Sequence, residues 1–208
     1  MKGVLIASCS ILILGFSANA QETSSIAFQV SGGFTTTVGN TARYLDNGWN
    51  LQGGIGYNFS PWVGALVDLG YNDMGINSTT LNNLGFPGGG VHVFSATLDP
   101  IVHLTPRRHF DLYVTGGGGL YHRFQDFTAP TVQTGFGCQP FFGCGPVAFG
   151  GTAILASSSV NKPGIDAGAG IAFGTKWHGK VFAEARYDRI FMGNFHTDYV
   201  PVSFGFRW

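Results

Sequence analysis

Apolar and polar side chains alternate with a period of two from Ile26 onward, a pattern typical of β-strands that present two different faces. In the first run, Ile26, Phe28 and Val30 share one face, while polar side chains share the other. Similar runs cover residues 26–36, 49–59, 63–71, 90–104, 110–123, 164–174, 181–189 and 199–208. The fourth is the least regular, because Pro100 cannot donate to a strand ladder and suggests a bulge or an end.

The connections between these eight runs alternate between short and long. Short ones are expected near Ser60, Thr105 and Trp177, and long ones at residues 37–47, 73–89, 123–163 and 191–198. No convincing helical pattern separates the runs. An even number of strands joined in this way predicts an all-β fold, an eight-stranded antiparallel up-and-down β-barrel with both termini on the short-turn side.

The apolar face decides the environment of this barrel. In a soluble barrel the large apolar side chains point inward, whereas in a transmembrane β-barrel they point outward. An eight-stranded lumen is too narrow to hold the Phe, Trp, Leu and Ile side chains of these strands. Aromatic residues also gather in two zones, Tyr57, Phe59, Trp62, Phe110, Trp177 and Trp208 near the short turns, and Trp49, Tyr71 and Tyr187 near the long connections. We therefore expect a transmembrane barrel, with a soluble barrel or sandwich as the alternative.

Residues 1–20 have the pattern of a secretory signal peptide. Lys2 precedes an apolar run over residues 4–16, and Ala18-Asn19-Ala20 forms a small-residue cleavage site. The mature barrel domain would then comprise residues 21–208. Lipidation of Cys9 is an alternative, although Cys9 lies inside the apolar run rather than after it.

Composition narrows the function classes. Charged residues make up 11% of the chain, against roughly 25% in ordinary soluble proteins, and the formal net charge is zero. There is no run of Lys or Arg, so the sequence does not favour a nucleic-acid partner.

The last strand carries the sharpest motif. Val200, Val202, Phe204, Phe206 and Trp208 alternate up to the final residue of the sequence. With the alternating strands, this ending resembles the small bacterial outer-membrane β-barrels of the OmpA-like and OmpX-like kind. The resemblance implies residence in the outer membrane, long loops outside the cell, and an assembly signal at Val202, Phe204, Phe206 and Trp208 that the barrel-assembly machinery reads. The family usually ends on Phe, so Trp208 is a departure.

Cys138 and Cys144 remain after cleavage of the signal peptide, and they lie within the longest connection. In an exported protein, a pair this close in sequence predicts a disulfide. Half of a metal site is the alternative, but no His, Asp or Glu lies nearby in the sequence. We therefore expect no metal and no cofactor.

Several charges fall on the predicted lumen face: Asp68, Asp111, Asp166, Glu184, Arg186, Asp188 and Arg207. Buried charges are costly unless they are paired, so we expect these residues to form a structural network. A narrow pore for ions or small solutes is the alternative.

A lipid-A-modifying enzyme is a second alternative, suggested by His196 and Asp198 near the outer rim. Thr197 lies where a serine nucleophile would be wanted, so we expect no enzymatic activity and assign no catalytic residue. We expect a monomer that contacts outer-membrane lipid, with a structural or surface-interaction role carried by long extracellular loops toward an unknown ligand.

Overall fold

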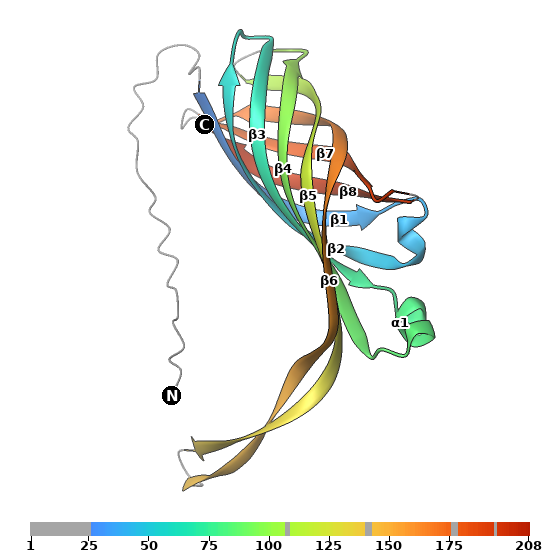
Figure 1. The fold of residues 1–208 in the computed structure, drawn as a ribbon. Coiled ribbons are helices and arrows are strands. Elements are labelled where there is room, and N and C mark those ends of the chain that lie inside the picture. The colour runs from blue at the N-terminus through green and yellow to red at the C-terminus, as the bar shows by residue number, and fades with distance from the viewer. Residues whose placement is uncertain (1–25, 107–108, 140–142, 176–178, 194) are drawn as a thin grey trace.

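The computed structural model describes residues 26–106, 109–139, 143–175, 179–193 and 195–208. The signal peptide predicted for residues 1–20 lies outside these residues. Eight antiparallel strands form a closed barrel in chain order (Figure 1). They are β1 (Ile26–Thr37), β2 (Leu45–Asn58), β3 (Val63–Ile76), β4 (Gly88–His103), β5 (Phe110–Gln139), β6 (Gly143–Gly174), β7 (Lys180–Phe191) and β8 (His196–Arg207). The predicted fold class is confirmed.

The first and last strands close the barrel. β1 pairs with β8 from Gln29 opposite Arg207 to Thr37 opposite Tyr199. At the short-turn end, the backbones of Phe28 and Trp208 exchange two hydrogen bonds of 2.8 and 3.0 Å. Closure leaves no open sheet edge within the barrel, which is what hydrocarbon requires of a membrane-spanning sheet.

The apolar face points outward, as the alternation predicted. Ile55, Leu69 and Phe204 expose 55%, 63% and 57% of their surface. Their neighbours in sequence on the opposite face, such as Asp68 and Ser203, are buried. Trp49, Tyr57, Trp62 and Trp208 are exposed at the two ends of this apolar band, whereas Trp177 lies outside the described residues. In water this exterior would be a very large apolar patch, and it is stable only against lipid.

Two of the long connections contain short helices. A 3₁₀ helix η1 (Thr41–Arg43) links β1 to β2, and α1 (Ser78–Leu84) links β3 to β4, where no helix was expected. Asn77 accepts a hydrogen bond from the Thr79 amide and so caps α1, which ends at Gly85 with a φ of 76°. Among the described residues, no helix is long and apolar enough to cross a membrane.

The third long connection differs most from the prediction. Residues 123–163 were expected to form a loop, but β5 and β6 continue through most of it as a paired antiparallel ribbon. Figure 1 shows this ribbon curving away from the barrel, far beyond the ends of the other strands. One register irregularity, between Phe127 and Thr128, interrupts the pairing. The prediction was wrong here because the ribbon lacks clean alternation: glycine, proline and small polar residues occupy many positions on both faces.

Candidate functional site

Arg186 of β7 occupies the centre of the lumen and contacts carboxylates from three other strands and its own. Its Nη1 lies 2.6 Å from Asp99 Oδ2, and its Nη2 lies 3.0 Å from Asp68 Oδ2 and 2.7 Å from Glu184 Oε1. Asp166 Oδ1 is 3.8 Å from Nη1, a longer ion pair without a hydrogen bond. The Arg186 side chain is only 5% exposed, so this guanidinium is buried and satisfied by several partners at once.

Asp99 is the member that the sequence analysis missed. It precedes Pro100, which was interpreted as an irregularity, and the β4–β5 ladder does omit both residues. The β3–β4 pairing nevertheless continues through Asp99 opposite Leu66. The side chains of Thr97, Asp99 and Ile101 therefore all point into the lumen. Their spacing of two in the sequence was the signal that could have identified Asp99 as a lumen residue.

Two uncharged residues connect further groups to this network. Gln29 donates from Nε2 to Asp68 Oδ1 at 2.6 Å and accepts hydrogen bonds from Arg207 Nε and Nη2. The Arg207 guanidinium also lies over the rings of Tyr113 and Phe182, at 4.9 and 5.0 Å. Arg207 is thus linked to the network through the side-chain amide of Gln29, and its guanidinium stacks on aromatic rings. Among the described residues, Arg207 makes no ion pair.

Among the described residues, no direct ion pair joins Asp188 or Asp111 to Arg186, so the network expected from the sequence is divided into separate hydrogen-bonded groups. Asp188 accepts a hydrogen bond of 2.9 Å from the Tyr121 hydroxyl. Asp111, near the short turns, is 2.8 Å from both Lys180 Nζ and His103 Nδ1. The sequence could not assign these partners, because they depend on the relative register of strands across the lumen.

Apolar side chains fill the lumen on both sides of the Arg186 network. Toward the long connections lies a cluster that we call the outer cluster, Leu45, Met74, Ile76, Val91, Val93, Tyr121, Ile190 and Tyr199. Toward the short turns lie Leu66, Ile101, Tyr113, Ala172 and Phe182. Tyr113 and Tyr121 lie against Gly170 and Gly164 of β6, where any Cβ atom would overlap the rings. The described interior is therefore packed in layers, an arrangement that does not favour the pore alternative.

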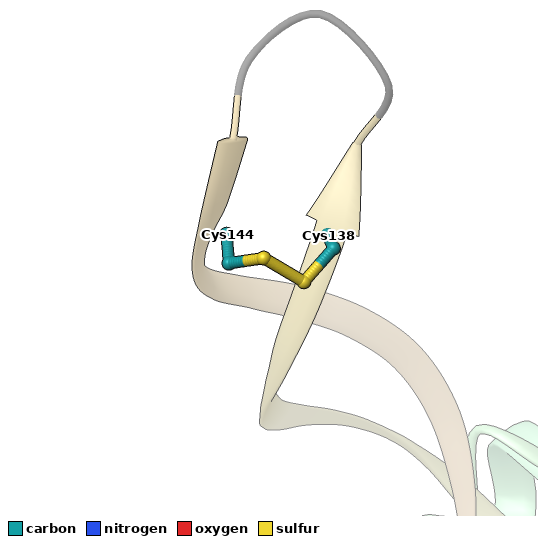
Figure 2. The surroundings of a disulfide bond; sticks show 2 residues. All are labelled: Cys138 and Cys144. Carbon is teal, nitrogen blue, oxygen red and sulfur yellow. A yellow bond between two sulfur atoms is a disulfide. The ribbon is translucent and has the colours of Figure 1, made fainter.

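The disulfide predicted between Cys138 and Cys144 is present in the structure, with its sulfur atoms 1.98 Å apart, and it joins β5 to β6 near the tip of the ribbon (Figure 2). Both cysteines are exposed and face each other directly in the strand register.

We define the outer ribbon as residues 127–139 of β5 and 143–161 of β6. The sequence from residue 127 to 161 contains no Asp, Glu, Lys, Arg or His. Val132, Phe136 and Ile154 are 71%, 80% and 63% exposed. A surface this apolar and free of charge is unusual for a segment outside the barrel.

His196 and Asp198, which suggested the enzyme alternative, are in contact at 3.2 Å. The Asp198 carboxylate is also held by Arg189, whose Nε lies 2.9 Å away. Within the described part of the chain, no serine hydroxyl lies in hydrogen-bonding contact with His196. Arg189 and Asp198 thus form an ion pair at the rim of the barrel, and this arrangement does not support the enzyme alternative.

The C-terminal motif runs along the closing seam. Val202, Phe204 and Phe206 face β1 and β7 across the ladder and point outward, while Ser203 and Arg207 are buried in the lumen. Trp208 stacks with Phe28 and Phe206, with ring centroids 6.1 and 5.8 Å apart.

Solved structures provide a comparison for this architecture. Neisserial surface protein A (NspA) superimposes with a TM-score of 0.54 over 88% of this chain and 96% of that one, at 13% identity. The fold is that of the small outer-membrane β-barrels. The outer-membrane protein OprG of Pseudomonas aeruginosa is also similar, with a TM-score of 0.47, 13% identity, and coverage of 87% of this chain and 94% of that chain.

Ail, the attachment invasion locus protein of Yersinia pestis, matches with a TM-score of 0.46 and 15% identity, over 89% of this chain and 100% of that chain. At these identities the likeness concerns the fold alone. No protein-family model matches the sequence, and no curated protein matches it. The fold and the lipid-compatible exterior together assign the protein to the bacterial outer membrane, as the sequence predicted.

Proposed function

We propose that this outer-membrane barrel acts at the cell surface as an interaction protein and that the outer ribbon is its contact surface. The observation that carries the proposal is the exposed, uncharged surface of the ribbon, with Val132, Phe136 and Ile154 all open to solvent. Exposed apolar surface of this kind is typical of sites where another molecule binds.

The architecture of the ribbon supports this role. A two-stranded ribbon by itself is at best marginally stable in water. The Cys138–Cys144 disulfide ties its tip, and both edges present backbone groups to which another chain could pair. A partner that covers the apolar side chains would supply the burial that the ribbon lacks.

The packed lumen supports the same proposal indirectly. The Arg186 network and the apolar clusters occupy the interior, so the residues open to other molecules lie on the outer connections. We infer that the closed barrel serves as an anchor in lipid, and we propose that it is a monomer.

The test uses surface display in a Gram-negative host. Ala129 and Ala153 face each other in the ladder, so replacing residues 130–152 by an Asn-Gly turn shortens the ribbon without changing the register of the barrel. Adhesion to cultured epithelial cells and cell–cell sedimentation are measured for the wild type and this variant. We expect the shortened variant to lose most of the adhesion that the wild type confers.

Two point variants refine the assignment. Phe136→Ser removes an apolar side chain of the ribbon that is 80% exposed, and Leu84→Ser removes one from α1 that is 54% exposed. We expect Phe136→Ser to weaken adhesion several-fold and Leu84→Ser to leave it unchanged. Equal adhesion of the wild type and the shortened variant, at equal surface levels, would contradict the proposal.

A further inference from the structure

A cavity of about 430 Å³ lies at the long-connection end of the barrel, separate from the outer ribbon and from the Arg186 network. Its lining comes from η1 and the residues that flank it, the start of β2, the end of β3, α1, β5, and the start of β8 with the residue before it. Leu45 and Ile76 contribute to its lining and also belong to the outer cluster, which therefore closes the cavity toward the lumen. This volume is within the usual range for small-molecule sites.

Arg123 of β5 lines this cavity. No ion pair to Arg123 occurs among the described residues, whereas Arg186 and Arg189 each contact at least one carboxylate. Its Nε atom is buried and makes no hydrogen bond. Its Nη2 donates to Gln125 Oε1 at 2.9 Å, which fixes the orientation of the guanidinium.

Three carboxylates near this end of the barrel contact residues other than Arg123. Asp198 is bound by Arg189 and His196, and Asp126 lies 3.2 Å from His92 Nε2. Asp188 accepts from Tyr121 in the layer below. A partly buried cation without a counter-ion is costly, and an anionic ligand would remove that cost.

The remaining walls are largely apolar or aromatic. Tyr44, Leu45, Ile76 and Phe195 contribute rings and aliphatic groups, which make up most of the exposed lining surface. The other lining residues are polar: Asn40, Thr41, Thr80, Gln125, His196 and Thr197. A guanidinium that has no acidic partner among the described residues, at one point of a mostly apolar cavity, matches a carboxylate on an apolar body better than it matches an inorganic ion. We propose that this cavity binds a small organic carboxylate with an apolar body, its carboxylate held by Arg123.

The experiment uses the full mature barrel in zwitterionic lipid nanodiscs and phenylbutyrate as the probe. Its neutral amide is the matched ligand, with the same apolar body and no charge. Affinity is measured by calorimetric titration against empty nanodiscs, and contact by the shift of the Arg123 Nε–H NMR resonance, identified by its absence from Arg123→Met. We expect phenylbutyrate to bind and to shift this resonance, and the amide to bind much more weakly.

Variants separate the site from general surface charge. Arg123→Met should weaken phenylbutyrate binding roughly tenfold or more, since a charge-assisted hydrogen bond is lost. Arg123→Lys, which keeps the charge but loses the fork, should weaken binding less and serves as the second variant if Arg123→Met fails to fold. Arg43→Met is the control, because Arg43 lies in η1 but does not line the cavity.

Loss of affinity in Arg123→Met, with an intermediate affinity in Arg123→Lys and no change in Arg43→Met, supports the proposal. It is overturned if the wild type does not bind phenylbutyrate, if the amide binds equally well, or if Arg43→Met causes the same loss as the Arg123 variants.

Discussion

At the scale of single residues, the interior is organised around one buried guanidinium. Arg186 contacts Asp68, Asp99 and Glu184 at 3.0 Å or less, and its side chain is 5% exposed. Removing one partner of a buried ion pair is costly because the remaining charges lose their compensation. Here four carboxyl groups, the fourth being that of Asp166, surround the single cation.

We therefore expect Arg186→Met to lower the free energy of unfolding by about 3–5 kcal/mol. The measurement is urea unfolding of the refolded barrel in detergent micelles, followed by tryptophan fluorescence. Arg189→Met is the matched control on the same strand, because Arg189 is partly exposed at the rim and its one acidic partner among the described residues is Asp198. A loss in Arg186→Met no larger than in Arg189→Met would show that the central network contributes little.

At the scale of elements, the backbones of β1 and β8 lie very close together where these two strands close the barrel. Gly33 lies opposite Ser203, and a Cβ atom added to Gly33 would overlap the Val202 carbonyl oxygen. A side chain there forces the two strands apart at the point where the barrel closes. Gly53 of β2, by contrast, has space for a Cβ atom, since its nearest neighbour would be the Gln29 carbonyl oxygen at 3.8 Å.

Gly33→Ala is thus expected to reduce the yield of folded barrel sharply, while Gly53→Ala folds like the wild type. Electrophoresis of boiled and unboiled samples measures the folded fraction through its altered mobility. If both variants fold equally well, the seam tolerates more separation than the structure indicates.

The elements also show where sequence reasoning succeeded and where it failed. The runs at residues 63–71 and 181–189 became parts of β3 and β7, because alternation of large apolar and small polar residues reports directly on a two-faced strand. The outer ribbon was missed because its pairing depends on one strand lying beside the other. Glycine occupies many of the paired positions, such as Gly150 opposite Val132 and Gly137 opposite Gly145. Neither strand taken alone therefore shows the alternation of apolar and polar residues that predicts a strand.

At the scale of the whole molecule, Trp208 lies at the seam where the barrel closes. Trp208 closes the ladder with Phe28 through two backbone hydrogen bonds and stacks on its ring. Its place at the short-turn end also suits an interfacial aromatic anchor. We propose that the barrel-assembly machinery reads Trp208 together with Val202, Phe204 and Phe206.

Deletion of Trp208 should consequently decrease the amount of barrel inserted in the outer membrane by several-fold in cells. The inserted fraction is measured by membrane fractionation and heat-dependent mobility. Trp62→Ala, an exposed tryptophan in a short turn, is the control for a general loss of interfacial anchoring. Normal insertion of the truncated chain would contradict the proposed role of the C-terminal motif.

The sequence by itself determined the properties that follow from local geometry. Successive side chains of a strand point to opposite faces, so alternation alone identified the eight strands, the lipid-facing side and the inward phase of Asp68, Glu184 and Arg186. The nearness of Cys138 to Cys144 in sequence was likewise enough to predict their disulfide.

Only the tertiary structure decided which inward groups meet. Arg186 reaches Asp99 and Asp68 across 87 and 118 positions of sequence, and no local pattern encodes such pairs. The stagger of the strands and the closure of the barrel set those contacts. The same arrangement separated Asp111 from the central network and placed Arg123 above the outer cluster, where it has no acidic partner among the described residues. The pairing of β5 with β6 continued into a ribbon beyond the membrane-spanning barrel.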